Sequence, residues 1–389
     1  MRLLVIGCGQ CGGRIADQFA RLGGRARAQR SIEIITDCFA INTDTADLTG
    51  LSLIKRDYEH RIVIGTRSTS GHGVGKINEL GAEIAREDGD AVIGVIGRTQ
   101  HLSETDAFLV AASAAGGTGS GTISVLTKQL KERYPEKPVY NLIILPFMHE
   151  EMNEERSVYN TATCLKSAYV AADAVFLVDN QRFLRKGLSL SDNLSRINAL
   201  IVEPFYNILC AGEEKKPEYI GSRTLDAGDI IQSLAGWSVI GYGKAPESPS
   251  GFHIGNRNFR DQAAEAHRGI QVMNSVLGDL SVKCDPKNAN RALYLLSASH
   301  QKMAVELVGE ISTVLKQFAT NAIIRGGDYP RVKHAMEIAI ILSELTTVKR
   351  VTDFFNKAIL YIAARKKQKG KDYGYDELGT SFGDIPSLL

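Results

Sequence analysis

At residues 111–122 the chain reads Ala111-Ala112-Ser113-Ala114-Ala115-Gly116-Gly117-Thr118-Gly119-Ser120-Gly121-Thr122. The apolar run 106–112 predicts a buried strand, and Ile123, Leu126 and Leu130 recur at helical spacing. Glycines let the backbone approach a ligand closely, and the first N–H groups of a helix have no intrahelical partner. With the helix dipole, this strand–loop–helix order predicts a phosphate site. A flexible glycine turn is the alternative. No Gly-Lys-Ser/Thr follows, so this is not a Walker A loop.

A second glycine-rich loop stands near the start of the chain. Gly7-Cys8-Gly9-Gln10-Cys11-Gly12-Gly13 follows a predicted strand at 2–6 and precedes a helix. Its glycines match the dinucleotide fingerprint, with Glu33 and Asp37 as possible ribose-binding acids, so an NAD(P)- or FAD-dependent oxidoreductase is one hypothesis. Cys8 and Cys11 suit redox or metal chemistry, but no second pair lies at zinc spacing. Small residues lining a tight loop are the simpler interpretation.

Two further loops have ligand-binding character. The segment 69–76 carries Gly71, Gly73 and Gly75 ahead of a helix, and their amides can hold phosphate oxygens. His72 and Lys76 in it are interpreted as solvent-facing charges. Asn42-Thr43-Asp44 ends another predicted strand. It is equally consistent with a ligand-contacting loop and with an Asx turn.

The motif Gly116–Gly121 resembles the signature loop of the tubulin/FtsZ superfamily of GTP-dependent, polymer-forming proteins, and the other motifs occur in that family's order. The resemblance implies GTP/GDP and Mg²⁺ as cofactors. It implies nucleotide-binding roles for Gly9, Gln10, Cys11, Gly12, Asn42, Asp44, Gly71, Gly73, Gly75, Gly116, Gly117, Thr118, Gly119, Ser120, Gly121, Glu155, Arg156, Asn180, Leu194 and Asn198.

The resemblance also indicates how the sugar and base are held. Arg156 matches the basic residue of a ribose-contacting loop, and its acid is Glu151, Glu154 or Glu155; the alternative is a charged helix start. Asn180 and Asn198 match asparagines that contact guanine, and an amide offers a donor and an acceptor side by side. Leu194 replaces the aromatic residue that stacks on the base in many members. Ala199 stands where FtsZ has a second base-contacting acid, so the base is held less securely than the phosphates.

Asp226 and Asp229 are the candidate catalytic residues. They are three apart at a predicted helix start, so helix capping is the simplest explanation. The family, however, carries a synergy loop here, although Thr224 replaces its usual asparagine. In the family such acids act on the nucleotide of the neighbouring subunit, where they orient the attacking water. Hydrolysis then requires head-to-tail self-assembly into a filament.

The predicted fold is α/β. It has an N-terminal doubly wound parallel-sheet GTPase domain (1–190), a long central helix from about 192 to 210 with the synergy loop (191–235), a smaller C-terminal α/β domain (236–365) and a tail (366–389). Residues 31–36 are a predicted strand, and 91–97 fits a strand or a helix. In the second domain we expect strands at 237–243, 290–296, 322–326 and 336–341, and helices at 260–278, 301–318 and 351–367.

Composition narrows the function classes. The 389 residues carry a net charge of +2, which gives no whole-chain argument for nucleic acid or an anionic membrane. No apolar run approaches the roughly 18 residues of a transmembrane helix. Six scattered cysteines indicate a reducing, cytoplasmic location. The end, 383–389, resembles the short peptide with which FtsZ binds partner proteins; a frayed tail is the alternative.

Within the superfamily the chain is most similar to the archaeal tubulin-like CetZ group, because it combines FtsZ-like loops, Gln10 and a helical C-terminal segment. This implies a cytoskeletal GTPase that controls cell shape or motility, with FtsZ-type division as the alternative role. A nucleotide-binding structural protein without turnover is a third hypothesis beside the oxidoreductase.

Overall fold

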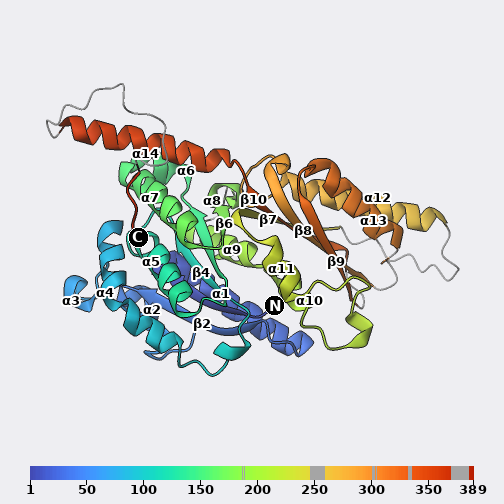
Figure 1. Ribbon diagram of the computed structural model, residues 1–389, viewed down its shortest axis with the longest axis horizontal. Coiled ribbons are helices and arrows are strands. Elements are labelled where there is room, and N and C mark those ends of the chain that lie inside the picture. Colours follow the sequence, from blue (N-terminus) through green and yellow to red (C-terminus); the bar gives the residue numbers. More distant parts are fainter. Residues whose placement is uncertain are drawn as a thin grey trace. The chain divides into compact units, whose positions relative to one another are not determined.

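The computed structural model describes residues 1–185, 187, 189–245, 259–299, 303, 305–331, 335–368 and 385–389 (Figure 1). It divides into two compact units, each assembled from separate stretches of chain. The N-terminal unit comprises 2–24, 35–202 and 348–389. The C-terminal unit comprises Met1, 25–34 and 203–347.

The N-terminal unit is built on a parallel sheet. Its strands are β1 (Leu3–Cys8), β2 (Ile35–Asn42), β3 (Arg61–Val63), β4 (Ala107–Ser113), β5 (Val139–Leu145) and β6 (Ala174–Asp179). They lie in the order β3-β2-β1-β4-β5-β6, and every neighbouring pair is parallel. Every residue of β1 and β5 is buried, as strands covered on both faces of a parallel sheet require, and the one side-chain amide in β5, that of Asn141, donates to Thr127 Oγ1 at 2.7 Å. The strand order reverses between β1 and β4, where such sheets bind ligands.

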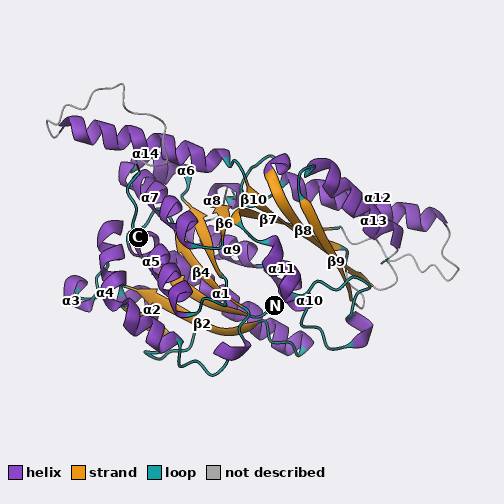
Figure 2. Cartoon of the chain, in the orientation of Figure 1, coloured by secondary structure: helices purple, strands orange, loops and turns teal. Residues whose placement is uncertain are grey.

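Helices flank these strands (Figure 2). They are α1 (Gly9–Arg30), α2 (Thr45–Thr49), α3 (Thr66–Thr69), α4 (Asn78–Ile96), α5 (Thr118–Arg133), α6 (Met148–Asn153), α7 (Glu155–Ala171), α8 (Asn180–Phe183), α9 (Leu190–Val202) and α14 (Lys349–Gln368). Helix α5 packs against α4 and α7, and α7 packs against α14. The ambiguous run 91–97 is the end of α4.

The C-terminal unit contains a mixed sheet. Its strands are β7 (Gly236–Lys244), β8 (Ala289–Ser299), β9 (Ile323–Arg331) and β10 (Glu337–Leu345), and its helices are α10 (Phe205–Ala211), α11 (Ala227–Ser233), α12 (Phe259–Gly278) and α13 (Val305–Phe318). Strand β10 runs antiparallel to β7 and β8, and β8 runs parallel to β9. Helix α12 packs on β7, β10 and α13.

The predicted α/β class is confirmed, but two elements differ from expectation. The helix predicted from about 192 to 210 is two helices, α9 and α10, because Pro204 between them lacks the N–H that a continuous helix needs. The strand predicted at 31–36 is wrong in its bounds, since α1 continues to Arg30 and β2 begins only at Ile35. Helix α14, which the sequence places with the second domain, belongs to the N-terminal unit.

Two expectations about the whole chain can be compared with the described residues. Among the described residues, none of the six cysteines forms a disulfide. None of the described helices is both long enough and apolar enough to cross a membrane.

Candidate functional site

A cavity of about 430 Å³ opens at the carboxyl ends of the parallel strands of the N-terminal unit. Each of β1, β2, β4, β5 and β6 contributes lining residues at its carboxyl end or within two residues beyond it. Its lining comprises Cys8, Gly9, Gln10, Cys11, Arg14, Asn42, Asp44, Asp47, Gly73, Lys76, Ser113, Ala115, Gly116, Gly117, Thr118, Gly119, Phe147, His149, Glu150, Asn180, Leu194 and Asn198. The first loop and the 116–119 loop, which the sequence separates by about a hundred residues, therefore share one cavity.

The start of α5 forms the floor of this cavity. Gly117 precedes the helix, and among the described side chains none caps it. Because no side chain competes for them, the first N–H groups of α5 suit an anionic ligand. The side chain of Ser120 is turned inward and donates to the Gly116 carbonyl oxygen.

The 71–76 loop is tied to the end of β2. The Gly73 amide donates to the Thr43 carbonyl oxygen at 3.2 Å, and the Thr45 amide donates to that of Gly71 at 3.2 Å. Gly71 and Gly73 both have φ of +79°, a left-handed conformation that favours glycine. In turn, the buried hydroxyl of Thr43 lies 2.6 Å from that of Thr118. Hydrogen bonds thus connect the 71–76 loop, the 42–45 segment and the start of α5.

Asp47 joins two predicted ligand residues. Its two carboxylate oxygens accept from Gln10 Nε2 at 2.6 Å and from Asn42 Nδ2 at 3.0 Å. Asn42 Oδ1 accepts from the Thr43 amide at 2.8 Å, and Asp44 caps α2 by accepting from the Ala46 amide at 2.8 Å. The Asx-turn interpretation of this segment therefore holds, and the same residues also line the cavity.

A buried amide on α7 supports two of the loops. Asn160 Nδ2 donates to the carbonyl oxygens of Ala115 (3.1 Å), Gly116 (3.0 Å) and Lys76 (2.9 Å). The Lys76 side chain is exposed, as predicted, and it also lines the cavity and pairs with Glu154. This pairing, led by the hydrogen bond from Lys76, lowers the pKa of the Glu154 carboxyl.

The far end of the cavity carries the candidate base-contacting residues. Asn180 is the first residue of α8, and Asn198 lies on α9, one turn after Leu194. Both amides are largely buried, at 9% and 8% exposure, and still reach the cavity. The two side-chain amides therefore offer hydrogen-bond donors and acceptors to a ligand in the cavity.

Arg350 at the start of α14 holds this end in place. Its guanidinium pairs with Glu151 of α6, lies 3.3 Å from the Asp179 carboxylate and donates to the Pro146 carbonyl oxygen at 3.4 Å. Burial raises the pKa of the Asp179 carboxyl, and Arg350 opposes that rise. One side chain thus ties α6 to the ends of β5 and β6, next to Phe147 and Asn180.

We expect Arg350→Lys to destabilise the N-terminal unit by about 2 kcal/mol, because an ammonium cannot reproduce the planar fork on a buried carboxylate. Chemical denaturation measures the change. Lys357 is the matched control, since it meets the same Glu151 at 3.1 Å from a half-exposed position. Lys357→Met should cost less than about 1 kcal/mol. Equal losses of unfolding free energy for both variants would contradict the role of Arg350 in tying α6 to the ends of β5 and β6.

The structure brings most of the predicted nucleotide residues together. Gly9, Gln10, Cys11, Asn42, Asp44, Gly73, Gly116, Gly117, Thr118, Gly119, Asn180, Leu194 and Asn198 line the cavity. Outside the lining lie Gly12, Gly71, Gly75, Ser120, Gly121, Glu155 and Arg156. Arg156 pairs with Glu79 of α4, and Glu155 is exposed.

Of the glutamates in the predicted ribose loop, Glu150 is the one on the cavity wall, whereas Glu151 pairs with Arg350 and Glu154 with Lys76. Sequence reasoning also missed Arg14 and Asp47. Arg14 had a signal, because it lies one helical turn after Gln10. Asp47 had none, because its contacts come from two other segments.

Asp226 and Asp229 belong to the C-terminal unit and form a reciprocal cap at the start of α11. The Asp229 amide donates to Asp226 Oδ1 at 2.8 Å, and Arg325 lies 3.4 Å from the Asp229 carboxylate. Asp226 is exposed. The capping role is therefore real, and it leaves the Asp226 carboxylate at the surface.

The Cys-x-x-Cys pair behaves as loop lining. Burial raises the pKa of the Cys11 thiol to about 12 and raises that of Cys8 further. Both thiols therefore stay protonated near neutral pH, and a thiol is a poor nucleophile and metal ligand.

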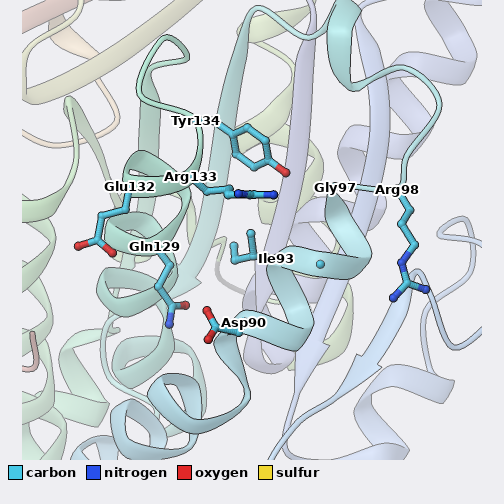
Figure 3. A pocket seen from close by; sticks show the side chains of 9 residues that line it. Asp90, Ile93, Gly97, Arg98, Gln129, Glu132, Arg133 and Tyr134 are labelled. Atoms are coloured by element: carbon cyan, nitrogen blue, oxygen red, sulfur yellow. The ribbon is translucent and has the colours of Figure 1, made fainter.

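A second cavity of about 510 Å³ lies at the C-terminal ends of α4 and α5, away from the ends that begin at the glycine-rich loops (Figure 3). Asp90 and Ile93 come from α4 and Gln129 from α5, and Arg98 and Tyr134 follow the two helices. Acidic and basic side chains are mixed around it, and none of the predicted nucleotide residues lines it. The cavity at the strand ends is therefore the candidate site.

Comparison with known proteins agrees with this geometry. Residues 2–186 match the model of the tubulin/FtsZ family GTPase domain, and 187–360 match that of the tubulin-like CetZ C-terminal domain. The tubulin-like protein CetZ1 of Haloferax volcanii is 34% identical over 377 residues, covering 92% of each chain.

Solved structures give the same answer. The GDP-bound monomer of Haloferax volcanii CetZ1 aligns with a TM-score of 0.79 and 31% identity, covering 93% of this chain and 100% of that one. A GTPγS-bound protofilament of CetZ2 from the same organism aligns with a TM-score of 0.80 and 27% identity, covering 94% and 100%. With its loops, its cavity and these relatives in agreement, the chain belongs to the tubulin-like CetZ family within the tubulin/FtsZ superfamily.

Proposed function

We propose that the chain binds GTP in the cavity at the strand ends, polymerises head to tail and hydrolyses GTP at the interface between subunits. The observation that carries this proposal is that three glycine-rich loops and two buried amides meet around one cavity. Solved structures of relatives support it, because they include a GDP-bound monomer of CetZ1 and a GTPγS-bound protofilament of CetZ2.

The two ends of the cavity suit the two ends of a nucleotide. The first N–H groups of α5 and of α1, which begins at Gly9, would hold phosphate oxygens. The Gly71 and Gly73 amides, predicted to do so, instead donate to Thr69 Oγ1 and to the Thr43 carbonyl oxygen. Lys76 and Arg14 add positive charge to the wall. Asn180 and Asn198 would read the edge of guanine, with Leu194 packing on its face in place of an aromatic ring.

The donor set also fits Mg²⁺. This ion prefers oxygen ligands and is commonly held by one or two carboxylates together with phosphates and waters. Asp44 and Asp47 provide such carboxylates on the cavity wall. Bound there, Mg²⁺ would neutralise phosphate charge.

The cavity lining contains no carboxylate from the synergy segment, since Asp226 and Asp229 lie in the other unit. A neighbouring subunit would bring Asp226 to the γ-phosphate, where its carboxylate would orient and polarise the attacking water. Each subunit would then complete the site of the next one.

The rate of GTP hydrolysis per chain tests the proposal, measured with light scattering as protein concentration rises. We expect turnover to climb above a threshold at which scattering also rises. A flat rate would contradict the shared site, and tight GTP binding without turnover would favour the structural hypothesis.

For the cell, we propose a cytoplasmic, cytoskeletal role in shape or motility, with FtsZ-type division as the second candidate. The oxidoreductase hypothesis is less well supported. The strand order of a dinucleotide-binding domain is compatible with this sheet. The oxidoreductase hypothesis, however, does not explain why Gly116–Gly119 lines the same cavity as the first loop.

A further inference from the structure

The last residues of the chain pack against the N-terminal unit. The C-terminus lies beside α4, α5 and α7 (Figure 1). Ile385 and Leu388 are only 1% and 4% exposed, and Leu388 joins an apolar cluster with Ala82, Ala85 and Val125. Burying two such aliphatic side chains removes apolar surface from water and stabilises the contact. The two residues are therefore anchors.

The backbone of this segment is held by side chains. The Leu388 amide donates to Ser167 Oγ at 2.8 Å, and its carbonyl oxygen accepts from Arg86 Nη1 at 2.7 Å. Lys166 Nζ donates to the Ile385 carbonyl oxygen. These bonds come from α4 and α7, so the main chain is gripped on both sides.

The intervening residues face away. Pro386 and Ser387 are exposed, and Leu389 is 37% exposed. The segment thus presents one anchor, two outward residues and a second anchor, which is the pattern of a short peptide read through two pockets.

The surface that receives Leu388 is made by small residues on α4 and by Val125 of α5. A Cβ on Gly121 would stand 2.7 Å from the Ala82 amide nitrogen, so the two helices approach closely there. Because Ala82 and Ala85 have small side chains, the Leu388 side chain fits against the contact between α4 and α5. The docking surface is consequently a property of α4 and α5, which begin at the candidate phosphate loops.

We propose that this groove, bounded by α4, α5 and α7, is a peptide-docking site whose resident occupant is residues 385–389 of the same chain. Residues 369–384 separate the segment from the end of α14. Sixteen residues span at most about 53–58 Å. A segment tethered to its own site binds at an effective concentration of the order of millimolar. Even a weak peptide site would then be mostly filled by its own tail.

The consequence is that the tail is withheld from other proteins. Any partner that reads the side chains of Ile385 and Leu388 must first take them out of the groove. The groove and the partner therefore compete for the same two anchors.

A labelled peptide tests the proposal directly. A fluorescein-labelled peptide of the sequence 383–389 is titrated against the full chain, Leu388→Asp and the matched control Ser387→Asp, which changes an exposed residue. Releasing the tail frees the groove, so we expect the peptide to bind Leu388→Asp about tenfold or more tightly than the other two proteins. Equal binding to all three proteins, or no binding to Leu388→Asp, would overturn the proposal.

Two further measurements fix the site and the occupant. Adding Arg86→Ala to Leu388→Asp should weaken peptide binding, and unchanged binding would show that the peptide docks elsewhere. The unmodified chain should sediment like Leu388→Asp in the presence of GDP. A heavier species that Leu388→Asp abolishes would place the tail on a second copy instead. None of these readouts uses GTP turnover, so failure here leaves the proposed function standing.

Discussion

Asp226→Asn is expected to reduce GTP turnover by about 100-fold or more while leaving GTP binding and the fold intact, because a positioned acid–base group contributes rate factors of that order. The substitution separates two roles of one side chain. Asparagine is as good a helix cap as aspartate, so it can keep the bond from the Asp229 amide to the side chain. It removes only the negative charge that would polarise water. Turnover at saturating GTP reports the catalytic role and thermal unfolding reports the capping role, while nucleotide affinity should stay unchanged.

Asp285 offers the matched control. It also caps a short helix in the C-terminal unit, where it accepts from the Lys287 amide at 3.0 Å. Asp285→Asn should leave turnover unchanged. If Asp226→Asn were to hydrolyse GTP at the rate of the unmodified chain, capping would be the whole role of Asp226, and the shared-site proposal would fail.

Gly121→Ala is expected to destabilise the N-terminal unit by about 3 kcal/mol, at the upper end of overpacking costs. The sign is informative, because alanine for glycine inside a helix is ordinarily favourable by about 1 kcal/mol. Here the added Cβ would stand 2.2 Å from the Asn78 carbonyl oxygen. That neighbour is backbone at the start of α4, so it cannot swing away as a side chain would. Thermal unfolding should move down by about 5 °C or more.

Gly94 on α4 is the control for helix propensity, since no atom lies within 4 Å of the point where an added Cβ would stand. Gly94→Ala should be neutral or stabilising by up to about 1 kcal/mol. Stabilisation by both substitutions would refute the close helix contact, and with it the origin of the tail groove.

The sequence predicts the fold well where burial alone decides it. The apolar runs 2–6 and 106–112 predict strands, and β1 and β4 form at those positions to within two residues. The run 91–97 is as apolar, but it lies in a helix, because a short apolar run is compatible with either structure until its packing is known. The break between α9 and α10 had a local signal in Pro204, which the helical periodicity on both sides concealed.

The candidate site divides in the same way. Residues with a chemical signature along the chain, such as the glycines and hydroxyls of 116–121, are found from sequence. Asp47, Asn160 and Arg350 are not, because each acts by joining segments that only the fold brings together. Their residue types are ordinary, and nothing near them in the sequence announces the contact.

The packing of the 117–121 glycines has an evolutionary consequence. An added Cβ would stand within 3 Å of Val74 and Lys76 at Gly117, of Cys8 at Gly119, and of Asn78 at Gly121. The backbone of each loop thus fits closely against another loop, and a larger residue in one loop requires a simultaneous change in its neighbour. Such loops diverge together or not at all, and the tail groove between α4 and α5 shares that constraint, whereas the outer surfaces of α4 and α7 remain open to drift.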